Sequence, residues 1–301
     1  MNSFSSILFP IDFSPASHAS AQFVKAIARR FQAEVYALHV VEVPPAWYSA
    51  PQAATFDPLI DISSVVEDRR AALRSFVSDE LSGTPVQQCV QTSSDPAAII
   101  ARFSQQNLAG LIAMPTHGYG PLRSLLLGSV TAKVLHDAEC PVWTLAHAGE
   151  AAFDPVTNWR RILCAVGGNS ADVPLIRWAA QLACEQGAEL ELVHAVTGLE
   201  GVPSHLANDP WEEFLFNVAG EQITKLQTEA GTGFPLCIEA GSASQVVRNV
   251  AIEHSADLVI VGRGAIQRPL GRLRSNAYAI VRDAPCPVIS VPGQVSKETA
   301  V

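Results

Sequence analysis

Short apolar runs alternate with amphipathic stretches along the first half of the chain. Residues 7–11 form a continuous apolar run, which predicts a short buried strand. Ser14 and Pro15 follow, a pair that is typical of a helix cap and first turn. Apolar residues then recur at helical spacing, at Ala21, Val24, Ala28 and Phe31. The pattern therefore predicts a strand that leads directly into an amphipathic helix.

The same alternation continues through the rest of this half. Apolar and β-branched runs predict strands over 34–41, 85–90, 108–114 and 142–146. Helical spacing predicts helices over 64–81, 95–106 and 127–137, whereas the four prolines of 43–62 predict an irregular excursion. Strands that alternate with helices indicate a parallel sheet with helices on both faces. Ligands of such sheets bind beside the carboxyl ends of the strands.

The second half of the chain repeats the first. ILFPIDFS at 7–14 returns as ILCAVGGN at 162–169, an offset of 155, and DAECPVWTL at 137–145 returns as DAPCPVISV at 283–291, an offset of 146. Matches at both ends of each copy indicate a duplication of a whole domain. We therefore expect two Rossmann-like α/β domains, each an open, twisted, parallel five-stranded sheet. Their expected bounds are 1–148 and 160–293, with a linker at 149–159 and a tail at 294–301.

The composition limits the classes of partner. The 301 residues are 48% hydrophobic and carry a net charge of −9, from 20 basic and 29 acidic residues. The negative charge disfavours nucleic acid and acidic membrane surfaces as partners. No apolar run approaches the ~20 residues of a membrane helix, and the N-terminus lacks the basic region of a signal peptide. None of the six cysteines forms a C-x-x-C pair, so we expect a protein of the reducing cytoplasm.

The segment after the fourth strand carries the clearest chemical signal. It reads MPTHGYGPLRSLLLGSV at 114–130. Glycines at 118 and 120 allow backbone amides to come close to a ligand, and Gly128-Ser129 opens the next helix. Free amides and the dipole at a helix start favour an anion, so the segment is suited to hold a phosphate. The alternative is an ordinary turn followed by a helix cap.

This segment resembles the nucleotide loop of the universal stress protein family. The family pattern is G-x-x-G, nine residues, then G-S or G-T; here Gly118 is followed by nine residues and then Gly128-Ser129, with Pro115 in place of the first glycine. The phrases ILxPxDFS and CPV at the ends of the domain strengthen the likeness. Because both copies carry parts of this pattern, the chain is similar to a tandem universal stress protein along nearly its whole length.

The resemblance implies an adenine nucleotide site in the first copy. Asp12, beside Pro10 and Ile11, would approach the ribose or adenine, and the backbone of Val41 would contact adenine. The phosphates would lie along the loop and the helix start, where the family positions are Met114, Pro115, His117, Gly118, Gly128, Ser129 and Val130. ATP is the expected ligand, with Mg²⁺ bound through its phosphates rather than by a protein metal site.

Three of these residues have a second interpretation. Asp12 could instead be a helix cap or the polar end of a buried strand. His117 could be an ordinary loop position with no role in proton transfer. Pro115 lacks an amide, so it could weaken binding or merely stiffen the loop. His39 and its counterpart His194 occupy matching places in their strands, which favours core packing over ligation.

The second copy departs from the pattern. Gly167 replaces the aspartate, and Arg274-Ser275 replaces the Gly-Ser pair, so we expect a degenerate site in a mainly structural domain. Its loop also contains Arg263, Arg268, Arg272 and Arg274 with no acidic residue among them. These arginines could hold a phosphate, reach toward the site of the other copy, or form a solvated or interface-paired loop.

Three functions are consistent with these features. We expect a stress-response regulatory protein that binds a nucleotide without catalysis, because the loop has neither a Walker lysine nor a paired carboxylate. The alternatives are a slow ATP hydrolase that uses His117 or Asp12, and an interaction module that binds no nucleotide. Family members commonly pair through the last strand, so the two copies are expected to pair within the chain. A remaining edge strand could then recruit a second chain to form a homodimer.

Overall fold

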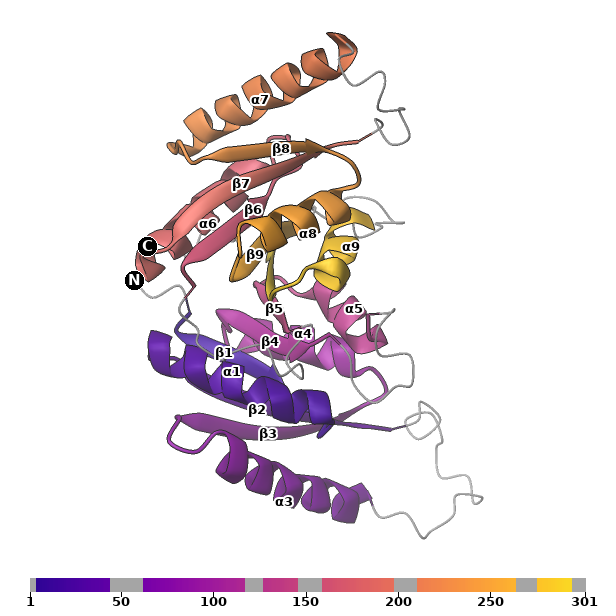
Figure 1. Ribbon diagram of the computed structural model, residues 1–301. Helices are drawn as coiled ribbons and strands as arrows, with labels where there is room; N and C mark the ends of the chain where they lie inside the picture. The colour runs from indigo at the N-terminus through magenta and orange to yellow at the C-terminus, as the bar shows by residue number, and fades with distance from the viewer. Residues whose placement is uncertain are drawn as a thin grey trace.

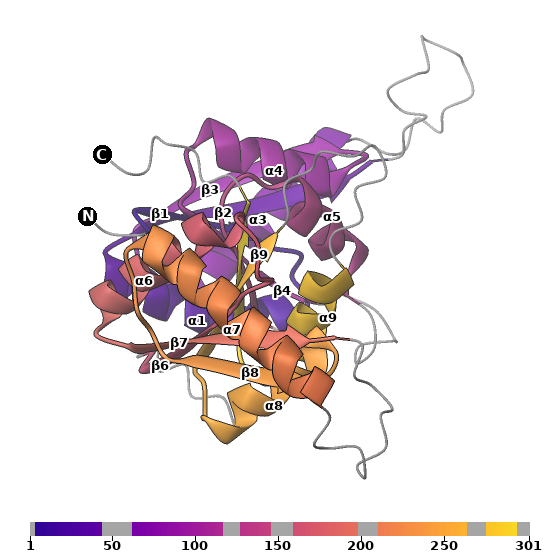
Figure 2. The same cartoon turned by 90° about the horizontal axis from the view of Figure 1, so that it is seen from above.

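The computed structural model describes residues 4–43, 62–116, 127–145, 159–197, 210–263 and 275–293. Within these ranges the two copies share one ten-stranded sheet in the order β3-β2-β1-β4-β5-β10-β9-β6-β7-β8. The result is an elongated molecule with α3 near one end and α7 near the other (Figure 1). Figure 2 looks at it from above, with α7 in front and the first domain behind.

The elements of the first domain follow the expected alternation. They are β1 (Ser6–Pro10), α1 (Pro15–Phe31), β2 (Glu34–Glu42), α3 (Ile62–Glu80), β3 (Val86–Ser93), α4 (Pro96–Gln106), β4 (Leu111–Pro115), α5 (Ser129–Asp137) and β5 (Val142–Leu145). Ser14 caps α1 as its sequence predicts, since its side chain accepts a hydrogen bond from the Ser17 amide. The fourth strand begins three residues later than expected, because Leu108 adopts a left-handed backbone with φ of 47°.

The second domain has the same order of elements. They are β6 (Arg161–Ala165), α6 (Asp172–Gln186), β7 (Glu189–Val196), α7 (Pro210–Ala230), β8 (Leu236–Ala240), α8 (Ala243–Glu253), β9 (Leu258–Arg263), α9 (Ser275–Asp283) and β10 (Val288–Pro292). Within each domain the pairs that join neighbouring strands are all parallel. The expected α/β fold with parallel five-stranded halves is therefore confirmed.

The halves meet at one antiparallel pair, β5 with β10. Trp143 faces Ile289, and these two residues are equivalent in the duplication. The Thr144 hydroxyl donates to the Val288 carbonyl at 3.2 Å, and the Ser290 hydroxyl donates to the Val142 carbonyl at the same distance. Equivalent residues thus exchange equivalent bonds, as at a two-fold interface between identical subunits. The chain makes this expected pairing within itself.

Helices cover both faces of the sheet, because side chains alternate along each strand. One apolar cluster joins α1, α3, α6 and α7 to residues such as Ile7 and Phe9, and the other joins α4, α5, α8 and α9 to residues such as Leu8. The first cluster crosses between the domains. Trp159, at the end of the expected linker, lies 6.2 Å from both Phe31 and Trp143, measured between ring centroids.

Some sequence expectations fall outside the part of the chain that the structure describes. The excursion at 43–62 falls there except for its two end residues, and so do most of the linker and the polar tail from residue 294. Among the described helices, none combines the length and apolar character that a bilayer crossing requires. All six cysteines are free thiols.

Trp143 is 1% exposed at the centre of the domain junction. We expect Trp143→Ala to lower the free energy of unfolding by about 3–5 kcal/mol, because it opens a large cavity in the shared core. Urea denaturation followed by far-UV circular dichroism measures this change. Trp211→Ala is the matched control: Trp211 is 58% exposed, so its removal is expected to cost less than about 1 kcal/mol. Equal losses in the two variants would contradict the account of the junction.

Candidate functional site

The first domain reverses its strand order between β1 and β4, where a doubly wound sheet offers a crevice. Only Ile7↔Leu111 and Leu8↔Ile112 pair across this point. The Ile11 amide donates to the Leu38 carbonyl of β2, and the Ile112 amide donates to the Pro141 carbonyl just before β5. Since amides alternate sides along a strand, the amide positions of Pro10 and Pro115 face each other's strand. Neither proline has a hydrogen to donate, so the ladder ends early.

The second domain shows what happens without the prolines. Its equivalent strands, β6 and β9, pair over four positions, up to Ala165↔Val261. The residues that match the two prolines are Ala165 and Gly262, and both have amides to donate. Pro115 therefore contributes to the early end of the β1–β4 pairing, a role that the sequence alone did not predict. The amide it lacks would face β1 in the sheet, and its absence helps to separate the carboxyl ends of β1 and β4.

Asp12 follows β1 at this switch point and is exposed. Its Oδ1 accepts hydrogen bonds from the Ser14 amide at 2.9 Å and from the Ser17 hydroxyl at 2.5 Å. Asp12 therefore does brace the start of α1, as the capping interpretation holds. Both bonds use the same oxygen, and Oδ2 accepts no bond from any described residue. The carboxylate thus has a fixed orientation and one oxygen that can still accept a ligand hydroxyl.

His39, from β2, secures the turn after β1. Its Nδ1 donates to the Ile11 carbonyl at 2.7 Å, and the ring lies 4.5 Å from the ring of Phe13, measured between centroids. Phe13 has a φ of 61°, a left-handed backbone that non-glycine residues seldom adopt. His194 makes the matching bond to the Val166 carbonyl at 2.9 Å. Both histidines therefore stabilise the turn after the first strand of their domain, in agreement with the structural role that their matching strand positions favoured.

Val41, the residue expected beside adenine, is buried near the carboxyl end of β2, where it pairs with Thr92 of the edge strand. β2 and β1 are neighbours in the sheet, so the end of β2 and the turn after β1 lie at the same edge. Met114 is 5% exposed and belongs to the core below this edge. Its side chain supports the crevice and does not line it.

The start of α5 is open toward the same edge. The Gly128 amide donates to the Thr116 carbonyl at 2.9 Å and so ties the two ends of the loop together. Gly128 is the N-cap and no side chain caps the helix. The amides of the first turn, those of Ser129 and Val130 included, therefore lack helical partners, as at every helix start. The Thr131 hydroxyl donates to the Pro115 carbonyl at 3.1 Å and fixes α5 to the end of β4.

The loop itself, including His117 and Gly118, lies outside the described residues. The described site therefore unites the ends of β1, β2 and β4 with the start of α5, and its sequence-predicted members are Pro10, Ile11, Asp12, Val41, Pro115, Gly128, Ser129 and Val130. Sequence reasoning missed Phe13 and Ser17. Ser17 lies three residues after the cap, where a capping box has Glu or Gln, so the sequence carried no clear signal of its bond to Asp12.

The second domain has different residues at the carboxyl end of its first strand, β6. Gly167 has no carboxylate, but Asp172 lies at the position that matches Ser17. Its Oδ2 accepts from the Asn169 amide at 2.9 Å, the counterpart of the Ser14 amide. Asp172 is only 6% exposed. In the second domain the carboxylate therefore lies at the buried start of α6 instead of the exposed end of the strand. It still accepts from the backbone amide of Asn169, but its burial makes it less accessible to a ligand.

An aromatic contact of the first domain is also replaced in the second. Phe13 contacts Phe76 of α3, with ring centroids 6.2 Å apart. Gly168 takes the place of Phe13, and the side chain of Gln222, from α7, donates to the Gly168 carbonyl. Gly168 has a φ of 77°, so glycine relieves the strain that Phe13 bears. The turn after β6 therefore has glycines where the turn after β1 has a carboxylate and an aromatic ring, and the degenerate second site stays a prediction.

Arg263 is the one arginine of the basic loop that the structure describes. It is 5% exposed and donates to the carbonyls of Leu135, Ala138 and Cys140 in the first domain. Arg263 is therefore paired at the interface between the two domains, which was one of the possibilities for this loop. Within the described ranges, no three histidine, cysteine, aspartate or glutamate side chains cluster as a metal site would require.

Burial lowers the pKa of His39 below its ordinary value, and Arg69 adds to this shift. The unfolded chain then binds more protons than the native one below about pH 6.5, so stability is lost as the pH falls through this region. We expect His39→Asn, which retains a donor near Nδ1, to make the decline between pH 7 and pH 5 shallower. Urea denaturation at each pH measures the slope, and an unchanged slope would contradict the prediction.

Comparison with known proteins supports one family for both halves. The model of the universal stress protein family matches residues 3–145 and 158–292. A universal stress protein of Methanocaldococcus jannaschii is 32% identical over 142 residues, which are 47% of this chain and 81% of that protein. One from Mycolicibacterium smegmatis is 25% identical over 214 residues, 69% of this chain and 68% of the relative.

Solved structures share the fold over the whole length. A universal stress protein from Archaeoglobus fulgidus has a TM-score of 0.66 at 19% identity, and the match covers 97% of each chain. Another solved universal stress protein, which was crystallised with cAMP, covers 45% of this chain at 19% identity, with a TM-score of 0.33. The match of the family model to both halves shows that this chain belongs to the universal stress protein family and carries two such domains in tandem.

Proposed function

We propose that the protein is a stress-response regulator that binds one adenine nucleotide, ATP, in its first domain. The observation that carries the proposal is the early end of the β1–β4 ladder. It sets an exposed carboxylate, Asp12, and an uncapped helix start, Ser129, at the edge of the same crevice. The second domain has a longer ladder and a buried carboxylate, and in our proposal its standard site is not used.

The start of α5 would hold the phosphates. The amides of Ser129 and Val130, together with the positive end of the helix dipole, suit the negative charge of a triphosphate. The exposed Ser129 hydroxyl adds a further donor. Mg²⁺ would be bound through the phosphate oxygens, because these supply hard oxygen ligands without a protein cluster.

The ribose and adenine would lie across the ends of β1 and β2. Asp12 Oδ2 can accept from a ribose hydroxyl, while Oδ1 holds the carboxylate in place through Ser14 and Ser17. The backbone near Val41 would bond the adenine edge. We place the protein in the cytoplasm, in keeping with its six free thiols. A homodimer would use the edge strands β3 and β8, since β5 and β10 already pair with each other.

Ser129→Asp tests the phosphate position. A carboxylate at the start of α5 repels the phosphates, so we expect ATP affinity to fall by at least about tenfold, or ~1.4 kcal/mol. Isothermal titration calorimetry with ATP and Mg²⁺ measures the affinity, with AMP and cAMP as further ligands. Ser275→Asp is the matched control, because Ser275 begins α9 at the equivalent place, and it should bind as the wild type does. Absence of ATP binding by the wild type would refute the proposed function.

Asp12→Asn tests the ribose contact. The amide retains an oxygen for Ser14 and Ser17 but replaces the second acceptor with a donor, so we expect affinity to fall roughly tenfold or more. Asp172→Asn makes the same change in the second domain, at the carboxylate that caps the equivalent amide. Calorimetry should show wild-type affinity for Asp172→Asn. A similar loss in both variants would point to a general effect on folding rather than a ribose contact.

A further inference from the structure

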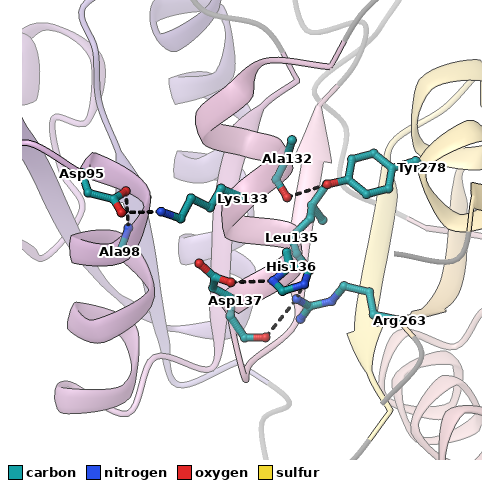
Figure 3. A network of polar contacts seen from close by, with 10 residues as sticks. Asp95, Ala98, Ala132, Lys133, Leu135, His136, Asp137, Arg263 and Tyr278 are labelled. Atoms are coloured by element: carbon teal, nitrogen blue, oxygen red, sulfur yellow. Dashed lines mark hydrogen bonds and ion pairs between the residues drawn. The ribbon is translucent and has the colours of Figure 1, made fainter. Parts of the chain in front are cut away.

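Two side chains of the second domain donate hydrogen bonds to α5 of the first domain and to the residues just after it (Figure 3). The Tyr278 hydroxyl, from α9, donates to the Ala132 carbonyl at 2.6 Å. The Arg263 guanidinium, at the end of β9, donates through Nη1 to the carbonyls of Leu135 and Ala138 at 2.6 and 2.9 Å, and through Nη2 to that of Cys140 at 2.5 Å. The contacts thus run from the first turn of α5 past its last residue.

Arg263 brings a positive charge to the carbonyl end of the helix. Its described hydrogen bonds go to backbone carbonyls, and the negative end of the helix dipole offsets the charge. Burial lowers its pKa to about 10, so the side chain remains charged at neutral pH. A buried charge of this kind is costly unless its partners stay in place, and the bonds therefore fix the position of α5.

The duplication has different side chains at the equivalent positions of the two domains. Tyr278 matches Ala132 itself, so the tyrosine bonds the backbone of its own counterpart near the two-fold axis. Alanine has no group to return the bond. Arg263 matches Thr116, which has a much shorter side chain. The second domain therefore contacts α5 through side chains at two positions where the first domain has alanine and threonine.

The opposite side of α5 is attached within the first domain. Lys133 pairs with Asp95, which also caps α4 by accepting from the Ala98 amide at 3.2 Å (Figure 3). Thr131 holds the end of β4 through the Pro115 carbonyl. The helix is nine residues long, and its internal backbone hydrogen bonds couple its two ends. A shift at its carbonyl end is therefore carried to Ser129 at its start.

We propose that Arg263 and Tyr278 are positioning residues for the phosphate site of the first domain. They hold α5 from its carbonyl end so that its amide end faces the crevice between β1 and β4. The second domain thereby becomes a part of the first domain's binding site without touching the ligand. This inference rests on the proposed function, since it assigns regulation to the same nucleotide site.

Arg263→Met tests the inference in the full-length chain. Methionine retains much of the side-chain volume but donates no hydrogen bond. We expect ATP affinity to fall roughly 3- to 30-fold, the range seen when a remote contact is removed. We also expect faster amide hydrogen exchange over 129–137 in the ligand-free protein, with little change in β1 and β2.

Arg177→Met is the matched control. Arg177, on α6, also donates to carbonyls at the end of a helix, those of Glu229 and Ala230, the last two residues of α7. It lies away from α5, so affinity and α5 exchange should match the wild type. Arg263→Lys retains the charge and is expected to recover part of the affinity, which loss of packing alone would not explain.

Tyr278→Phe keeps the proposal testable if Arg263→Met does not fold. It removes only the hydroxyl, and we expect a smaller loss of affinity with faster exchange near Ala132. A folded Arg263→Met, or failing that Tyr278→Phe, with wild-type affinity and unchanged α5 exchange would overturn the inference. A wild type that binds no ATP would overturn the proposed function instead. The exchange rates of α5 would then still show whether the second domain holds the helix.

Discussion

The arrangement of the two domains depends on the antiparallel pair that β5 and β10 form. This pair lies on an approximate two-fold axis, because Trp143 faces its own counterpart Ile289 and the hydroxyls of Thr144 and Ser290 exchange equivalent bonds. It merges two parallel sheets into one and leaves β3 and β8 at the edges. It also brings β9 and α9 against α5, so the same pairing creates the contacts that hold the helix of the candidate site.

Comparison of the two copies distinguishes the residues that stabilise the fold from those that a binding site would use. Both copies retain the histidine that secures the turn after their first strand, His39 and His194, and both cap the following amide with a carboxylate. Only the first copy exposes that carboxylate and ends its β1–β4 ladder early. The capping role is therefore structural, whereas the exposed position of Asp12 is what a ligand would use.

Local patterns in the sequence predicted most of the elements and the residues that gather at the crevice. Ser14 and Pro15 mark the start of α1, and the two repeat offsets align the copies strand by strand. The consequences of Pro115 could not be predicted, because they depend on which neighbouring strand its amide position faces. The partners of Arg263 lie more than a hundred residues away in the sequence, and the withdrawal of a carboxylate to Asp172 appears only when the two domains are compared in space.

In our proposal, the first domain binds a nucleotide at the ends of β1 and β4, and the second domain binds none at the equivalent place. A crystal structure of the full chain grown with ATP and Mg²⁺ tests it most directly. The account predicts one nucleotide, with its phosphates at the amides of Ser129 and Val130, its ribose at Asp12, and no nucleotide between β6 and β9. A nucleotide bound in the second domain alone, or an empty first crevice at saturating ATP, would contradict it.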